Sequence, residues 1–428
     1  LSFDTEPVFH DNNNIKKQIL NILSRLALSK TSIVASLSAI PLNFQIKLSL
    51  RGARKLIPIY PYIDGIENYN HLINTKFRQA ALNLDHINCD NQFVDFINLN
   101  LKKYLPVCFV EGFGRLRLLS KRYGKAPSAL IVGTEMYSRC ESFMHWAAMN
   151  SLAGTKLFSM QHGGNYGMEF RSEKTFIEIN AYDKFYTWGW NWHQFKNNDP
   201  KRLKPMTSIF LQNVKKIPKN LNNKIEILYT VTSIKSKVRR FDCSAMNPYI
   251  SEKYFLDQIK FYRSLNGPNK DNVRVRLYKD DLKNNYFDKW KKEFPTVKFD
   301  GNSNFNLSLH EANLYVGDCL QTTWIEALSI NKPFVLFVSP NLYDFTPEFE
   351  KIVTKLISIN AFHYSPESAA YFINDNYSEL NKWWLSSVVQ GTISEVRKQI
   401  AWNPLNSTEL WLRELNSIHS SLQDNGSA

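Results

Sequence analysis

The sequence predicts an α/β protein with two Rossmann-like domains that face a cleft, followed by a tail of C-terminal helices. Short apolar runs typical of buried strands alternate with stretches of helical spacing, around residues 128–160 and again over residues 224–338. Each run ends in polar residues or glycine, as parallel strands do where their carboxyl ends carry a ligand site. The predicted domains are 1–205, 206–380 and 381–428.

The elements of the first domain follow from hydrophobic spacing. Residues 1–75 are expected to be largely irregular, and residues 128–160 to form a parallel β-α-β unit. The expected helices are 15–28, 77–104 (one or two), 108–123 and 141–152, and the expected strands are 128–134, 156–160 and 184–190. Residues 54–60 have a strand-like pattern that is broken by Pro58.

The second domain repeats the alternation after residues 191–223, whose Lys, Asn and Pro residues are typical of an interdomain linker. Its final part, 366–417, is expected to be mostly helical. The expected strands are 225–231, 273–278, 297–300, 314–316 and 334–338, and the expected helices are 249–265, 282–293, 306–311 and 322–329.

The amino-acid composition and net charge indicate which classes of binding partner to expect. The 428 residues are 43% hydrophobic, enough for two ordered cores, and carry a formal net charge of +14. This excess favours an anionic partner, such as a phosphorylated small molecule or an acidic membrane surface. We expect no nucleic-acid partner, because the lysines and arginines form no stripe interleaved with aromatic residues.

Cysteine and histidine usage predicts neither disulfides nor a metal site. The five scattered cysteines include no C-x-x-C pair and the nine histidines no H-E-x-x-H motif. We therefore expect a cytoplasmic protein without a metal or other cofactor. The apolar stretch 31–50 is interrupted by polar residues and proline, so it fits neither a secretory signal nor a membrane span. The chain begins without methionine, which is compatible with residues upstream of Leu1.

The first candidate site is the turn at 161–167, where a buried strand stops at a Gln-His pair followed by two glycines. An imidazole, with an ordinary pKa of about 6.5, suits proton transfer near neutral pH, so His162 is a candidate general base. A hydrogen-bonded turn residue is the open alternative. Glu135, at the preceding strand tip, is a second candidate base or nucleophile, or a carboxylate stabilised by a helix N-terminus. Substrate contacts are expected from Gln161, Gly163, Gly164 and Asn165.

The second candidate site is the strand-turn-helix block at 314–337. Thr322 and Thr323 open its helix, and their hydroxyls and the free N–H groups of the first turn are expected to point outward toward a phosphate. Glu326, one turn later, suits the two hydroxyls of a ribose. A helix cap with a capping box is the open alternative.

Other strand tips should converge on this edge of a parallel sheet. Arg276 and Lys279 would supply positive charge, although Arg276 could instead be a buried partner of Glu326 or Asp318. The absence of P-loop and G-x-G-x-x-G motifs argues against a P-loop nucleotidase and a dinucleotide oxidoreductase. The candidate nucleotide-binding residues are Arg276, Lys279, Ser303, Asn304, Gln321, Thr322, Thr323 and Glu326.

Several motifs together resemble a family of transferases encoded in bacterial surface-polysaccharide loci. The likeness covers roughly residues 128–402, and the first hundred residues match weakly. The motifs are 161–167, 186–190, 276–278, 322–328 with Lys332-Pro333, 366–370 and Trp383-Trp384. More broadly, the 322–333 block is similar to the donor-nucleotide motif of GT-B glycosyltransferases, including capsule enzymes that use CMP-activated ulosonic acids such as Kdo or pseudaminic acid.

The resemblance implies a GT-B-like glycosyltransferase with a nucleotide-sugar donor in 206–380 and a glycan or lipid-linked glycan acceptor against 1–205. Peripheral attachment to the inner face of the cytoplasmic membrane would fit the positive charge. The open alternatives are CDP-polyol phosphotransfer in the same cleft and a non-catalytic scaffold of a polysaccharide assembly complex.

The Gln-His-Gly turn also looks like the Trp-His-Gly motif of CDP-glycerol glycerophosphotransferases, whose histidine deprotonates the acceptor hydroxyl. His162 and Gly163 match that motif position for position. Capsule β-Kdo transferases commonly carry Glu-Asp-Gly at this turn, so their carboxylate nucleophile is not carried over. Whether the reaction retains or inverts the anomeric configuration stays open.

Overall fold

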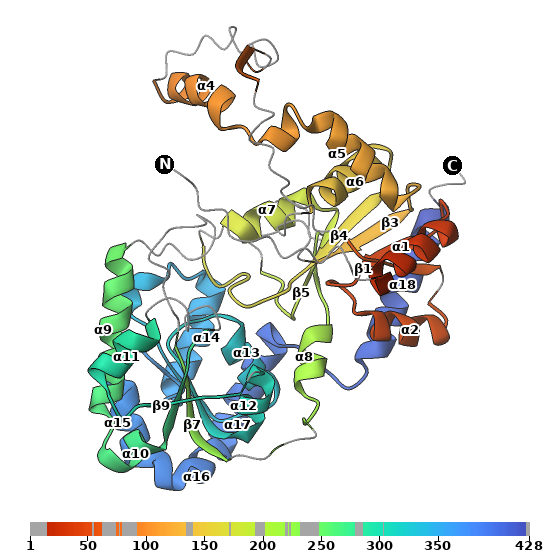
Figure 1. The fold of residues 1–428 in the computed structure, drawn as a ribbon. Coiled ribbons are helices and arrows are strands. Elements are labelled where there is room, and N and C mark those ends of the chain that lie inside the picture. The colour runs from red at the N-terminus through yellow and green to blue at the C-terminus, as the bar shows by residue number, and fades with distance from the viewer. Residues whose placement is uncertain are drawn as a thin grey trace. The chain divides into compact units, whose positions relative to one another are not determined.

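The computed structural model forms two compact units, which are described separately (Figure 1). Unit 1 is Leu1–Met160 with Leu412–Ala428, and unit 2 is Gln161–Trp411. The domain boundaries at 205 and 380 stay predictions. The structure describes residues 15–53, 55–61, 74–76, 78, 92–133, 140–170, 173–192, 202–218, 221, 224–231, 248–278, 286–302 and 304–424.

Unit 1 contains four parallel strands in the order β2-β1-β3-β4. They are β1 (Ile33–Ser36), β2 (Leu56–Ile59), β3 (Ala129–Val132) and β4 (Lys156–Met160). All four residues of β1 and of β3 are buried, as expected for parallel strands covered on both faces. The helices of this unit are α1 (Ile15–Ala27), α2 (Leu42–Leu50), α4 (Gln92–Tyr104), α5 (Phe113–Ser120) and α6 (Glu141–Leu152), with short 3-10 turns η3 (Val107–Phe109) and η4 (Lys121–Tyr123).

Unit 2 contains a six-stranded parallel sheet in the order β12-β11-β10-β7-β8-β9. Numbered within this sheet, the order is the 3-2-1-4-5-6 arrangement of Rossmann folds, and it reverses between β7 and β10. The strands are β7 (Ile225–Thr230), β8 (Val273–Arg276), β9 (Lys298–Phe299), β10 (Ala312–Gly317), β11 (Phe334–Phe337) and β12 (Phe362–His363). The parallel pair β5 (Lys184–Thr187) and β6 (Leu203–Pro205) also belongs to this unit.

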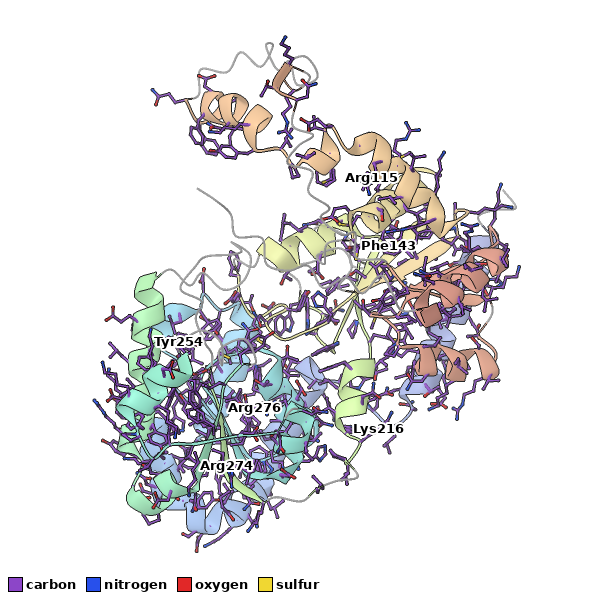
Figure 2. All side chains as sticks on the ribbon, in the orientation of Figure 1. Arg115, Phe143, Lys216, Tyr254, Arg274 and Arg276 are labelled. Atoms are coloured by element: carbon purple, nitrogen blue, oxygen red, sulfur yellow. The ribbon has the colours of Figure 1, made fainter. Side chains whose placement is uncertain are left out.

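Alternate side chains of the six-stranded sheet enter two different cores. Leu228, Tyr315 and Leu336 pack in one cluster with Trp324 of α13, whereas Tyr229 packs in the other. Arg274 and Arg276, labelled in Figure 2, lie on β8 of this sheet. The helices of unit 2 are α7 (Glu173–Ala181), α8 (Ile209–Val214), α9 (Pro248–Ser264), α10 (Gly267–Asn272), α11 (Tyr286–Glu293), α12 (Phe305–Glu311), α13 (Thr322–Ser329), α14 (Pro347–Ser358), α15 (Pro366–Asn376), α16 (Leu380–Trp384) and α17 (Ser387–Ile400), with 3-10 turns η8 (Pro340–Leu342) and η9 (Tyr377–Glu379). Helix α18 (Ser407–Asp424) begins in unit 2 and belongs to unit 1 from Leu412 onward.

The predicted α/β, GT-B-like class is confirmed in its two sets of parallel strands and its helical C-terminal region. The predicted linker is wrong for residues 202–218, which form β6 and α8. The segment is rich in Lys and Asn, but it also contains apolar side chains that are buried in the structure and were overlooked in the sequence. They are Leu203, Met206, Ile209, Leu211 and Val214. Within the described part of the chain, no helix combines the length and apolar character needed to cross a membrane.

Candidate functional site

The candidate site lies where the strand order of the six-stranded sheet reverses. At the carboxyl ends of the two central strands, Gly317 of β10 pairs with Thr230 of β7. In open parallel sheets the ligand crevice opens at this point, beyond the strand ends. Residues 318–321 follow β10 directly and lead into α13, so the first turn of α13 stands at the reversal.

Helix α13 begins without a side-chain cap. Its N-cap residue is Gln321, whose side chain makes no capping hydrogen bond, so the alternative interpretation of a threonine cap is wrong. In the ranges that the structure describes, no hydrogen bond is found for the N–H groups of Thr322 and Thr323. Uncapped N–H groups at a helix start, with the positive end of the helix dipole, favour an anion such as phosphate.

The two threonine hydroxyls of α13 are engaged inside the protein. Thr322 Oγ1 accepts a hydrogen bond of 2.9 Å from the backbone N–H of Gly164, and Thr323 Oγ1 lies 2.8 Å from the hydroxyl of Tyr315. The expectation that both hydroxyls point outward to a phosphate is therefore wrong. Thr322 instead fastens the 161–167 turn to the start of α13, which brings the two predicted constellations together.

The two glycines of the turn allow this close approach. A Cβ atom on Gly164 would lie 2.6 Å from the carbonyl carbon of Gln321, and one on Gly163 would lie 3.1 Å from Thr322 Oγ1. Glycine is needed here, as predicted, but the neighbour is the backbone of α13 in place of the expected ligand. Asn165 adopts a left-handed φ of 64°, and its amide, oriented to suit its neighbours, donates to the carbonyl oxygens of Gly164 and Leu320.

Gln161 braces the turn from inside the protein. Its Oε1 accepts hydrogen bonds from the backbone N–H of Trp188 (2.9 Å) and from Trp190 Nε1 (2.8 Å). Its Nε2 donates to the carbonyl oxygen of Gly163 at 2.9 Å. The side chain is buried, so the structure gives Gln161 a positioning role and links the turn to the aromatic segment that follows β5.

His162 belongs to a hydrogen-bonded chain of three side chains. Its Nε2 lies 2.5 Å from the hydroxyl oxygen of Tyr166, and that hydroxyl donates to Glu178 Oε1 at 2.6 Å. A tyrosine hydroxyl has one proton to donate. Because the Tyr166 hydroxyl donates that proton to Glu178, the Tyr166 oxygen can only accept a hydrogen bond from His162 Nε2. Nε2 also lies 3.3 Å from Glu178 Oε1, so Tyr166 and Glu178 together orient the imidazole ring through this nitrogen. The His162 side chain is 15% exposed, whereas Glu178 is buried on α7.

Glu326 is a buried carboxyl at the same site. The residue is 8% exposed, and among the described residues no hydrogen bond to its carboxyl group is found. Burial raises its pKa to about 8, against the opposing charge of Arg276. Near neutral pH the group is therefore largely protonated and can donate as well as accept a hydrogen bond.

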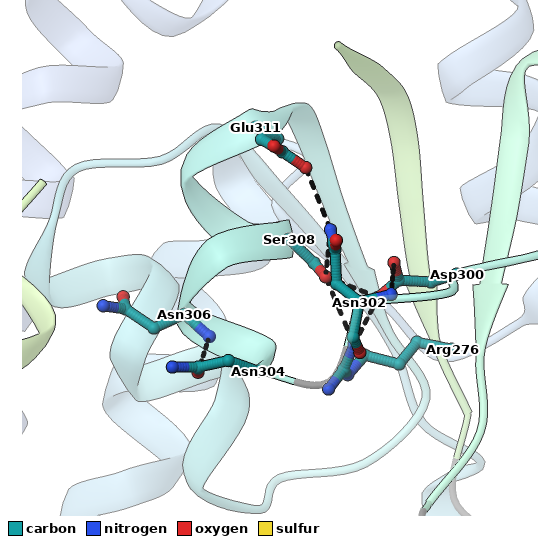
Figure 3. Close-up of polar contacts among 7 residues, drawn as sticks. All are labelled: Arg276, Asp300, Asn302, Asn304, Asn306, Ser308 and Glu311. Carbon is teal, nitrogen blue, oxygen red and sulfur yellow. Dashed lines mark hydrogen bonds and ion pairs between the residues drawn. The ribbon is translucent and has the colours of Figure 1, made fainter. Parts of the chain in front are cut away.

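Arg276 ends β8 and is bound to an acidic partner (Figures 2 and 3). Its guanidinium forms an ion pair with Asp300 and donates to the carbonyl oxygen of Asn302 (3.0 Å) and to Ser308 Oγ (3.2 Å). The predicted alternative partners were wrong, since this partner is Asp300 and neither Glu326 nor Asp318. Asp300 compensates much of the charge of Arg276, which weakens the case for Arg276 as a phosphate ligand.

The remaining predicted residues lie at the edge of the site or outside the described part of the chain. Asn304 is exposed and caps α12, where its side chain accepts from the N–H of Asn306 at 2.9 Å (Figure 3). Glu135, Lys279 and Ser303 lie outside the described residues. Within the described ranges no group of three or more metal-ligating side chains is found, and the absence of a cofactor stays a prediction.

The sequence matches a protein-family model described as LIC12162 family transferase over residues 4–415. The chain belongs to the LIC12162 family of transferases. A search of curated proteins gave no match. Similar solved structures include the wall teichoic acid polymerase TagF (10% identity, 96% of this chain and 95% of that chain, TM-score 0.45). WaaG, a glycosyltransferase involved in lipopolysaccharide biosynthesis, gives 10% identity, 90% and 99% coverage and a TM-score of 0.39. Alr3699/HepE of Anabaena, in complex with UDP and glucose, is 9% identical over 94% of this chain and 100% of that chain, with a TM-score of 0.42. Similarity at this level identifies no substrate.

Sequence reasoning missed three elements of this LIC12162 family transferase site. Tyr166 and Glu178 complete the chain from His162, and the segment 343–346 runs beside the end of the turn. Thr346 Oγ1 donates to the carbonyl oxygen of Gly167 at 2.9 Å, and Glu169 forms an antiparallel bridge with Phe345. Burial, with a smaller effect of Asp344, raises the pKa of Glu169 to about 7. Glu178 lies in a stretch for which the sequence predicted no element, and no spacing linked it to His162. Tyr166, within the quoted motif, was the available signal.

Proposed function

We propose that this LIC12162 family transferase is a glycosyltransferase of surface-polysaccharide biosynthesis that uses a nucleotide-sugar donor. The proposed donor is a CMP-activated ulosonic acid such as Kdo or pseudaminic acid, and the acceptor is a glycan or lipid-linked glycan. The observation that carries the proposal is the 2.9 Å hydrogen bond from Gly164 to Thr322 Oγ1. It fixes an imidazole-bearing turn beside an uncapped helix start at the strand reversal of a Rossmann-like sheet.

The donor would bind at the start of α13. Its phosphate would accept hydrogen bonds from the N–H groups of Thr322 and Thr323, with Gln321 beside them. Glu326 would bond the ribose hydroxyls, and its protonated carboxyl would not repel the phosphate. Arg276, at the end of β8, and Lys279 would add positive charge, and Ser303 and Asn304 would border the same edge.

The acceptor would be activated by His162. The imidazole would take the proton of the acceptor hydroxyl while the oxygen attacks the anomeric carbon, whose bond to the phosphate oxygen breaks and releases CMP. Tyr166 and Glu178 would hold the imidazole in the required tautomer and stabilise the imidazolium that forms. Gly163, Gly164 and Asn165 would shape the acceptor side, and Glu135 is the second candidate base. The reaction is proposed to need no metal and to take place in the cytoplasm.

The test is incubation of the protein with CMP-Kdo, CMP-pseudaminic acid, CDP-glycerol and UDP-glucose, with water or a glycan as acceptor. Phosphorus NMR separates the reactions, because glycosyl transfer from a CMP-sugar releases CMP and leaves no phosphorus on the acceptor. CDP-polyol phosphotransfer would instead create a phosphodiester. We expect CMP release from a CMP-linked donor.

Matched variants assign the roles. His162→Ala should lower turnover by about 10²–10⁴-fold while CMP affinity stays unchanged, since the base does not hold the nucleotide. Unchanged turnover would remove His162 from the mechanism. If calorimetry detects no binding of cytidine or uridine nucleotides, the scaffold alternative replaces the proposal.

A further inference from the structure

Helix α1 of unit 1 has its polar side turned inward. A surface helix normally buries its apolar stripe. In α1 the buried residues include the polar Asn21 and Ser24, whereas four large apolar side chains are 50–78% exposed. These four are spaced as one helical face, namely Ile19, Ile22, Leu23 and Leu26. We name this face the α1 stripe.

A pair of hydrogen bonds fixes the rotation of α1. Asn21 Nδ2 donates to the carbonyl oxygen of Tyr60 at 2.7 Å, and the N–H of Tyr60 donates to Asn21 Oδ1 at 2.9 Å. Tyr60 directly follows β2, so Asn21 ties the helix to the sheet. Turning the α1 stripe inward would break both bonds and leave polar groups of Asn21 and Tyr60 without partners, which is costly in a buried position. The outward orientation is therefore built into the fold.

The next helix repeats this arrangement. In α2, Leu42, Ile46 and Leu50 are spaced four residues apart and are all exposed. Exposed basic side chains, Lys47 and Arg51, accompany them. Both helices pack against β2, and Figure 1 shows them together in unit 1.

The segment that carries these two helices has charges of one sign. Residues 12–63 contain eight lysines and arginines and no aspartate or glutamate. A basic helix with an exposed apolar face is typical of segments that lie in the interface of an anionic bilayer, where each basic residue near the surface adds attraction. A second copy of the same surface would bring like charges together, and a nucleic acid would leave the apolar side chains unburied.

We propose that the α1 stripe, with the exposed apolar face of α2 and the surrounding basic residues, docks on an anionic lipid bilayer. The apolar side chains would enter the boundary between headgroups and acyl chains, and the basic side chains would meet the lipid phosphates. This surface lies outside the proposed transfer site, so the docking does not depend on the identity of the donor.

The test is co-sedimentation of the full chain with vesicles of phosphatidylcholine alone and of phosphatidylcholine mixed with phosphatidylglycerol. We expect binding to the mixed vesicles only, weakened by added salt. The double substitution Leu23→Ser with Leu26→Ser should weaken binding at least about tenfold, because both side chains would lose their apolar burial. Because both residues are exposed, folding should be unaffected, which circular dichroism checks.

The matched control is Leu405→Ser, which makes the same change at a fully exposed position outside this segment. It should bind vesicles like the wild type. Three results would overturn the proposal: equal binding to neutral vesicles, no binding to either kind, or sedimentation-velocity data in which the wild type is a dimer and the double variant a monomer.

Discussion

Replacing Gly164 by alanine tests whether the histidine turn must touch α13. The added methyl would lie 2.6 Å from the carbonyl carbon of Gln321, 2.7 Å from its oxygen and 2.8 Å from the nitrogen of Thr322. Favourable carbon contacts lie at about 3.5–4.0 Å, so the two backbones would have to separate by roughly 1 Å. Backbone atoms cannot rotate away as a flexible side chain can, and the hydrogen bond from Gly164 to Thr322 would break.

The expected cost combines two effects. Overpacking of this kind costs about 1–3 kcal/mol and the lost hydrogen bond about 0.5–1.5 kcal/mol, so we expect roughly 2–4 kcal/mol in total. For a unit of this size that loss lowers the Tm by roughly 4–16 °C. CMP affinity should fall by about tenfold or more, because the start of α13 moves.

Thermal unfolding and calorimetric titration of CMP are the assays, and two other glycines provide the controls. Gly163→Ala meets only the Thr322 hydroxyl at 3.1 Å, so its cost should be smaller. Gly391 is an exposed position within α17 with nothing within 4 Å of an added Cβ, so Gly391→Ala should stabilise the protein by about 0.4–1 kcal/mol. A Gly164→Ala variant as stable as the wild type would refute the contact between turn and helix.

Three further outcomes are expected. Thr322→Val leaves the N–H of Gly164 without an acceptor and should cost about 1–3 kcal/mol in urea unfolding, whereas Thr322→Ser should cost less; equal costs would contradict the hydrogen bond. Glu326 has a folded-state pKa raised to about 8, so its stabilising contribution is complete below the unfolded-state pKa of about 4.3 and is lost as pH rises toward 8. Between pH 4 and 9 the free energy of unfolding of Glu326→Gln should therefore rise relative to that of the wild type by on the order of 3–5 kcal/mol. If the two proteins showed the same pH dependence of this free energy, the burial of a protonated carboxyl would be contradicted. Hydrogen bonds from Arg78 lower the pKa of Glu111 to about 2, so the stability of this pair is present above about pH 4.3 and is lost as pH falls toward 2. Glu111→Gln should cost about 1.5–3 kcal/mol at pH 7 and little at pH 2, a difference that acid unfolding measures.

The sequence predicted elements with strong local signals and missed those without them. The bounds of α6, β4 and α13 were predicted to the residue, because each has a clear apolar pattern between polar or glycine residues. Strand β1 and helix α2 were missed. The polar residues and proline of the apolar stretch 31–50 hid the boundary between them, and α2 exposes apolar side chains, so it does not show the usual helical period.

The candidate site was predicted in outline. Parallel strands bring their carboxyl ends to one edge, which sufficed to expect the histidine turn and α13 near the same ligand. The partners of each side chain depend on tertiary contacts, so Glu178 behind His162 and Asp300 beside Arg276 could not be inferred from spacing. The protonation of Glu326 likewise depends on its burial, which local sequence does not reveal.

The most direct test of the proposed site is an experimental structure of the wild-type chain with CMP bound. We expect the phosphate to accept hydrogen bonds from the N–H groups of Thr322 and Thr323, the ribose hydroxyls to contact Glu326, and Gly164 still to donate to Thr322. A nucleotide bound elsewhere, or a histidine turn separated from α13, would contradict this expectation.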